Sequence, residues 1–260
     1  MAESIPEDVS RRYANETRRL LNEAKKRGIT LRLLGAQAVR EHCPNFRHLL
    51  DQIGRGYVDI DFVGISEQRK QLKQLFAYQG YEIDRQVLVA AEGRRYIFQN
   101  RNNIVVDVMI DRLDFCHVID VKSRLDLDYP TLTLADLLLS KLQIVDIADK
   151  DLQDAIVLLL EHDVSDDEAP EFINKKYITG LLAADWGFYY TVNRNLLRLK
   201  SYSAGVDWLM DAYKVSLVDK IDVLLKAFES AQKTTCWHLR KLIGTHVAWY
   251  RQVSDRGQIF

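Results

Sequence analysis

The pattern of hydrophobic and polar positions divides the chain into a mixed first part and a helical second part. Up to about residue 121, short apolar runs with the period of a strand alternate with helical stretches. After Pro130 the apolar positions recur at helical spacing. The runs that predict strands are residues 29–35, 58–63, 81–83, 86–91, 94–99, 103–110 and 117–121.

Helical periodicity accounts for most of the remaining chain. In residues 66–80 the apolar side chains lie on one face, with Ser66 expected as the N-terminal cap and Gly80 as the stop. Leu72, Leu75 and Phe76 are expected to face inward. The other predicted helices are one that ends before Gly28 and those over residues 36–43, 133–147, 150–162, 174–200, 205–232 and 236–253.

This arrangement predicts an α+β protein in two parts. Residues 1–163 are expected to form a mixed β-sheet domain with flanking helices. Residues 164–260 are expected to form an all-helical C-terminal domain, beginning at the charged, proline-containing stretch 163–172. In the helical part, the aromatic residues of the stretch "ADWGFYY" are expected to pack between helices.

Composition narrows the class of protein. The 260 residues are 47% hydrophobic and 28% charged, as in a soluble globular protein, and the net charge of -1 does not indicate a nucleic-acid-binding surface. Three cysteines without CxxC spacing and a polar N-terminus favour a cytoplasmic location. The longest apolar stretch is interrupted by Asp136 and Lys141, so we expect no membrane span.

Two aspartates interrupt the predicted strand "VDIDFV". Side chains two residues apart on a strand project from the same face, so Asp59 and Asp61 lie together. Two adjacent carboxylates repel each other unless a cation lies between them, and Mg²⁺ or Mn²⁺ is suited to such oxygen ligands. The alternative is that the pair lies on the solvated face of an edge strand.

Two further features favour the metal interpretation. Asp107 interrupts an otherwise apolar face of the strand 103–110, where an unpaired carboxylate is costly. Gly35 ends the strand before the helix at Ala36, and a glycine there lets a phosphate approach backbone N–H groups. Asp111, at the end of the same strand, is better explained as a turn residue.

Taken together, the segments "LLGAQAV", "VDIDFV" and "VVDVM" resemble the nucleotidyltransferase superfamily related to DNA polymerase beta. The chain is most similar to abortive-infection-type nucleotidyltransferase toxins and to small antibiotic nucleotidyltransferases. Arg55, four residues before the first aspartate, fits their pattern, as do Lys141 and the "KDLQD" segment with Asp151 and Asp154. The resemblance covers about residues 29–162. It departs from the family at Gly35-Ala36, where a second glycine or a serine is expected.

The resemblance implies a metal-dependent enzyme that moves a nucleoside monophosphate from a nucleoside triphosphate to an acceptor hydroxyl. The acceptor is a small molecule, a protein or a tRNA end. Asp59, Asp61 and Asp107 would be the catalytic and metal-binding residues. The nucleotide would be bound by Gly35, Ala36, Arg55 and Lys141.

Several alternatives stay open. Lys141 can pack its stem and extend its ammonium group to water, and Arg55 can be an ordinary surface residue. Asp151 fits favourable placement at a helix N-terminus, while Asp154 can orient Lys141. The altered glycine turn also fits a catalytically inactive binding module, for example of a toxin–antitoxin pair. A third possibility is an α+β scaffold without a nucleotide site.

Overall fold

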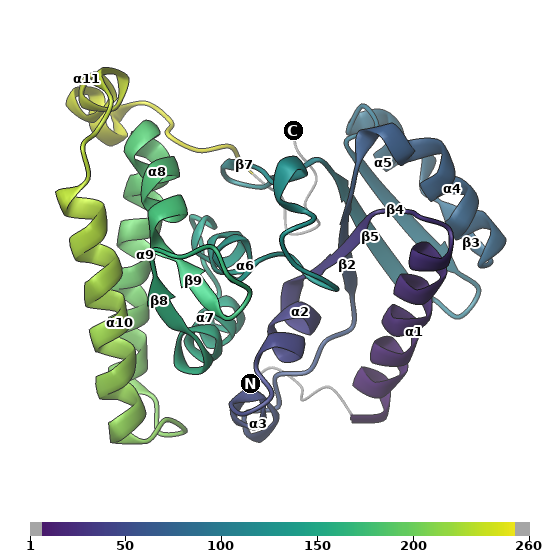
Figure 1. Cartoon of the computed structure of the whole chain (residues 1–260), viewed down its shortest axis with the longest axis horizontal. Coiled ribbons are helices and arrows are strands. Elements are labelled where there is room, and N and C mark those ends of the chain that lie inside the picture. Colours follow the sequence, from purple (N-terminus) through teal and green to yellow (C-terminus); the bar gives the residue numbers. More distant parts are fainter. Residues whose placement is uncertain (1–6, 253–260) are drawn as a thin grey trace.

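A mixed five-stranded sheet forms the centre of the first part of the chain (Figure 1). The computed structural model describes residues 7–252, and the order across the sheet is β1-β2-β5-β4-β3. Strand β2 runs parallel to β5, and every other neighbouring pair in this sheet is antiparallel. The strands are β1 (Leu31–Leu34), β2 (Ile60–Gly64), β3 (Tyr81–Ile83), β4 (Arg95–Asn100) and β5 (Val105–Ile110).

The two faces of this sheet differ in chemistry. One face is apolar because Phe62, Phe98 and Val106 alternate inward, and it is covered by α1 (Glu7–Lys26) and α4 (Arg69–Tyr78). Phe76 of α4 stacks on Phe98 with ring centroids 4.1 Å apart. The polar positions of the central strands therefore project from the opposite face.

The chain after Pro130 is mostly helical, and its helices pack on the part that contains the five-stranded sheet. The pair α6 (Leu134–Leu142) and α7 (Asp149–Glu161) contacts α2 (Gly35–His42) on one side and α9 (Trp186–Gly205) on the other. The remaining long helices are α8 (Lys175–Ala184), α10 (Asp211–Ser230) and α11 (Thr235–Ile243). The α+β class is confirmed, while the division at residue 163 stays a prediction. Among the described helices, none combines the length and apolar character that a membrane crossing needs.

Some local predictions were wrong. Residues 86–91 form a helix, α5 (Arg85–Ala90), because the Asp84 side chain caps it by accepting hydrogen bonds from two backbone N–H groups. Ser66 caps no helix through its side chain. Instead its backbone N–H donates to Asp111, a left-handed residue with φ +65°.

Other short elements were not foreseen. They are α3 (Arg47–Gln52), β6 (Arg112–Asp114), which pairs with the expected β7 (Val118–Asp120), and the two-stranded parallel pair β8 (Asp163–Ser165) and β9 (Phe172–Asn174). The predicted helix over 174–200 divides at Asp185, whose side chain caps α9. The last helix also ends earlier than expected, at Ile243, and Val253 lies outside the described residues.

The aromatic residues of the second part pack between helices, as expected. Trp186 is buried and stacks on Tyr190 with ring centroids 5.2 Å apart. Tyr189 makes an edge contact with Trp237 of α11 at 5.2 Å. The contact of Tyr189 with Trp237 joins α11 to α9, whereas the stack of Trp186 on Tyr190 lies within α9, and the rings act as packing side chains.

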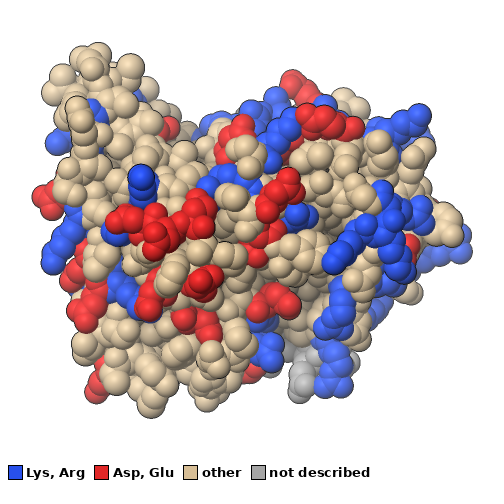
Figure 2. All heavy atoms as spheres, viewed as in Figure 1, with Lys and Arg blue, Asp and Glu red and all other residues tan. Residues whose placement is uncertain are grey.

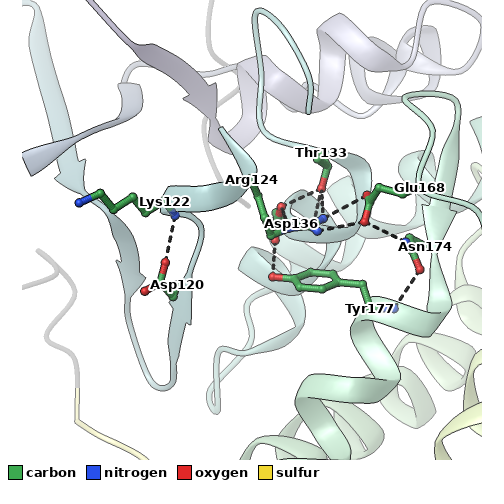
Figure 3. A network of polar contacts seen from close by, with 8 residues as sticks. All are labelled: Asp120, Lys122, Arg124, Thr133, Asp136, Glu168, Asn174 and Tyr177. Carbon is green, nitrogen blue, oxygen red and sulfur yellow. Dashed lines mark hydrogen bonds and ion pairs between the residues drawn. The ribbon is translucent and has the colours of Figure 1, made fainter. Parts of the chain in front are cut away.

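A buried polar cluster links the short 3₁₀ turn Lys122–Arg124 to the helical part (Figure 3). The Arg124 guanidinium donates to Asp136 at 2.9 Å and to Glu168 at 3.0 Å, and it lies 3.5 Å from the centroid of the Tyr177 ring. Tyr177 and Thr133 donate their hydroxyls to Asp136, which is completely buried. Every group in this cluster has a partner of opposite charge or a hydrogen bond, so it stabilises the contact between the two parts.

Candidate active site

Two of the three predicted acids are direct neighbours in the sheet. Asp61 on β2 pairs in register with Asp107 on β5, so both side chains project from the face opposite the apolar core. Asp59 lies two residues before Asp61, just ahead of the strand, and is exposed. The structure thus brings carboxylates from two distant segments of the chain to one polar face.

Gly35 lies directly against this group of acids. The residue has φ +75°, and a Cβ atom added to it would come 2.4 Å from the Asp61 Oδ2 atom. Only glycine can occupy this position without moving the carboxylate. The turn at Gly35-Ala36 therefore sets the start of α2 beside Asp61, as the order of the motifs predicted.

The surroundings of Asp61 disfavour its charged form. Burial raises the pKa of the Asp61 carboxyl well above its ordinary value, and the nearby charges of Asp59 and Asp107 raise it further. Lys141 and Arg95 act in the opposite direction but do not offset these effects. The face therefore carries an excess of negative charge that an added cation would relieve.

Asp107 has a partner that the sequence did not reveal. Arg95 of β4 donates from Nε to the two Asp107 oxygens at 2.9 and 3.0 Å, and from Nη2 to Oδ2 at 2.5 Å. Both side chains are about 15% exposed, so the ion pair is largely removed from water. Alternation in the run "RRYIFQ" places Arg95 opposite the apolar face, but only the strand order shows that it meets Asp107.

The fit to a divalent cation is therefore partial. Asp59 and Asp61 offer the oxygen ligands that Mg²⁺ and Mn²⁺ prefer, and Asp61 lacks a compensating charge of its own. Within residues 7–252, however, no group of three or more His, Cys, Asp and Glu side chains is arranged to hold a metal ion. As placed here, the first two acids fit a cation, and Asp107, bound by Arg95, does not complete the set.

Arg55 and Lys141 lie in a second, buried cluster of charges. Arg55 Nη2 donates to Asp154 Oδ2 at 2.9 Å, and Lys141 Nζ lies 2.9 Å from the same oxygen. Lys141 also bonds to Asp151 at 3.0 Å. The ammonium group of Lys141 thus does not reach water, and Asp154 does orient it. Whether Arg55 and Lys141 also touch a nucleotide stays a prediction.

The balance of charge in this second cluster is favourable. Burial by itself would raise the pKa of Asp154, yet Lys141 and Arg55 together hold it below its ordinary value. Burial likewise lowers the pKa of Lys141, but Asp154 and Asp151 outweigh that effect and raise it. Both residues are therefore charged at neutral pH, and the cluster lies close enough to act on Asp61 through Lys141.

A cavity of about 840 Å³ lies between α1 and α2 and borders Gly56 and Tyr57, just before Asp59. Its lining carries more positive than negative side chains, and the three site aspartates are not part of it. Figure 2 shows Lys and Arg side chains gathered along α1, while the other half of this face carries most of the Asp and Glu. The net charge of -1 thus conceals a separation of charge. The arginines of the cavity are Arg11, Arg18, Arg40, Arg47 and Arg55, and its acids are Glu41 and Asp51.

The fold and the site define the chain as an α+β protein with carboxylates on one face of a mixed sheet. No family model matches the chain, and no curated protein matches it. Among solved structures the chain is similar to the solution structure of the antibiotic-resistance factor ANT(2'')-Ia. The TM-score is 0.42 and the sequence identity 10%, over 67% of this chain and 95% of that chain. A likeness at this level assigns no activity to the chain.

Proposed function

We propose that the chain is a metal-dependent nucleotidyltransferase that moves a nucleoside monophosphate from a nucleoside triphosphate to an acceptor hydroxyl. The observation that carries the proposal is the pairing of Asp61 with Asp107 on parallel neighbouring strands, with Asp59 two residues away and Gly35 pressed against Asp61. Acids that repel each other on one face suit a site where a ligand supplies positive charge.

The residues around this face have distinct roles in the proposed reaction. Asp59 and Asp61 would hold a Mg²⁺ ion, which supplies positive charge to the triphosphate when bound. The N–H groups of the first turn of α2 have no side-chain cap, since the residue before Gly35 is Leu34, and they suit a phosphate. Asp107 would accept the proton of the acceptor hydroxyl once its carboxylate is released from Arg95.

The buried cluster around Asp154 would support this face. Lys141 is held by Asp151 and Asp154, so its charge is fixed in place beside Asp61. A fixed charge stabilises a neighbouring anion without a cost of reorganisation. Arg55, held by the same Asp154 and lining the cavity between α1 and α2, would face the phosphates from the other side.

The direct test is a transfer assay. The purified protein is incubated with Mg²⁺ or Mn²⁺, each labelled nucleoside triphosphate and a cell lysate, and labelled products are identified by mass spectrometry. We expect a labelled acceptor with at least one nucleotide, and a loss of at least about 100-fold in Asp59→Asn, Asp61→Asn and Asp107→Asn.

Asp126→Asn is the matched control because the Asp126 side chain is 93% exposed and pairs with Arg32 at a distance of 3.4 Å. This variant should transfer as well as the unchanged protein. Equal loss of activity in the control would show that the effect is not specific to the three site acids. A collapse of the melting temperature in all three site variants would show that these acids are structural. Labelled product at undiminished rate in those variants would place the chemistry elsewhere.

A second function has support in one observation. Arg95 covers both oxygens of Asp107, and an acid neutralised in this way suits an inactive, nucleotide-binding member of the fold. On that alternative the protein binds nucleotide without transferring it. Calorimetric titration with Mg-ATP and Mg-CTP separates the cases, because heat of binding without product in the transfer assay supports the binding module.

A further inference from the structure

Arg95 contacts one of the three acids of the site, Asp107, and so limits the access of a cation to that carboxylate. Asp61, Asp107 and Arg95 project from one face of three adjacent strands, in the order β2, β5 and β4. Arg95 approaches Asp107 from the side away from Asp61, and it contacts both carboxylate oxygens. A cation ligand needs at least one of those oxygens.

The ion pair is strong enough to compete with a cation. Its geometry combines three hydrogen bonds of 2.5–3.0 Å between one guanidinium and one carboxylate, and both side chains are about 15% exposed. Charged hydrogen bonds that are shielded from water are stronger than those at the surface. A divalent ion therefore competes with Arg95 for the oxygens of Asp107.

The formal charges lead to the same conclusion. Asp59, Asp61 and Asp107 sum to -3, and Arg95 reduces this to -2, which one divalent cation balances. A second divalent cation would leave the site with an excess of positive charge unless phosphate groups arrive with it. A triphosphate also offers the guanidinium an anionic partner when it leaves Asp107.

We propose that Arg95 is a positioning residue that occupies Asp107 until the nucleotide arrives, so that the acid becomes available only in the presence of substrate. In the nucleotide-free protein, Arg95 competes with divalent cations for Asp107. When a triphosphate binds, Arg95 transfers its hydrogen bonds to phosphate oxygens and releases the acid. This inference rests on the proposed function, and it explains why no three-acid metal group is arranged within residues 7–252.

The test measures Mn²⁺ binding to the nucleotide-free protein by electron paramagnetic resonance, with no turnover involved. We expect Arg95→Gln to bind Mn²⁺ roughly tenfold more tightly than the unchanged protein, the factor that loss of one competing charged hydrogen bond produces. The double variant Arg95→Gln, Asp107→Asn should lose this gain, since the released carboxylate is then absent.

Two further variants separate the effect of geometry from that of charge. Arg94→Gln removes the same charge from the adjacent residue, which pairs with Glu92 at 3.0 Å, and its Mn²⁺ affinity should not change. Arg95→Lys keeps the charge but loses the planar guanidinium that bonds both carboxylate oxygens. Its Mn²⁺ affinity should therefore lie between that of Arg95→Gln and that of the unchanged protein. Melting curves recorded in parallel show that each variant is folded.

The outcomes distinguish this inference from the proposed function. An unchanged or weaker Mn²⁺ affinity in both folded Arg95 variants overturns the inference, and it leaves the proposed function standing if Mn²⁺ still binds together with nucleotide. An equal gain in Arg94→Gln also overturns it, because a general charge effect would then suffice. Absence of Mn²⁺ binding in every variant, with and without nucleotide, overturns both.

Discussion

Asp61 and Asp154 are two carboxylates that both interact with Lys141, and their surroundings shift their pKa values in opposite directions. Asp154 has two cations as neighbours, and its pKa is held below the ordinary value despite complete burial. Asp61 has two other carboxylates as neighbours, and its pKa is raised well above that value.

The opposite pKa shifts distinguish a carboxylate in a structural ion pair from one in the proposed active site. The cluster of Asp151 and Asp154 with Arg55 and Lys141 is charge-balanced. Asp136 is likewise paired with Arg124 (Figure 3), and such clusters hold elements in place. The cluster around Asp61 is unbalanced and would gain stability from a ligand of positive charge. Removing a carboxylate from one of the paired clusters should therefore destabilise the protein. Removing the carboxylate of Asp61 should stabilise it.

The largest effect is expected at Asp154. Asp154→Asn leaves the charges of Arg55 and Lys141 without their shared partner, which should lower the free energy of unfolding by about 3–5 kcal/mol. Thermal and urea unfolding measure this change. In the control Asp151→Asn, Lys141 keeps Asp154, so a loss of at most about 1 kcal/mol is expected. Equal losses in the two variants would contradict the assignment of Asp154 as the centre of the cluster.

An intermediate effect is expected at Asp136. Asp136→Asn removes the closest anion of Arg124, but Glu168 remains bound to the guanidinium, so the loss should be about 2–3 kcal/mol. The control is Glu168→Gln, whose side chain is 36% exposed, and there we expect less than about 1 kcal/mol. A larger loss in the control would mean that the exposed ion pair, and not the buried one, stabilises this contact.

Sequence periodicity was sufficient to predict the parts of the fold that depend on local pattern. The helix around Leu72 and Phe76, its end at Gly80 and the strands that carry Asp61 and Asp107 are confirmed. One failure arose where a distant residue decides the local structure, whereas the helix α5 was missed although its cap, Asp84, is adjacent in sequence. Asp111, which lies between β5 and β6, accepts a hydrogen bond from the backbone N–H of Ser66, where the Ser66 side chain was expected as the cap.

The site shows the same limit. The spacing of Asp59 and Asp61 predicts that they share a face, because alternation along a strand is a local property. That β5 lies beside β2 in register, and that β4 brings Arg95 to Asp107, depends on the order of strands in the sheet. Alternation in "RRYIFQ" places Arg95, and not Arg94, on the face away from Tyr96 and Phe98, but nothing in this segment identifies Asp107 as its partner.

The smallest effect, and the only one of opposite sign, is expected at Asp61. Because its folded-state pKa is raised, the carboxyl contributes stability that is fully present below the unfolded-state pKa of about 3.9 and is lost as pH rises through the folded-state value. Asp61→Asn keeps the shape of the side chain without this loss. The variant should therefore melt about 2–4 °C higher than the unchanged protein near pH 7.5, in buffer with a chelator of divalent cations.

Lowering the pH should remove the advantage of this variant. Below about pH 4 the carboxyl is protonated in both the folded and the unfolded chain, so the two proteins should then melt at similar temperatures. Asp126→Asn, at an exposed position, serves again as the control and should show no such pH-dependent gain. A destabilised Asp61→Asn at pH 7.5 would mean that the negative charge is already compensated within the fold. The contrast with Asp154 would then disappear, because both acids would belong to structural ion pairs.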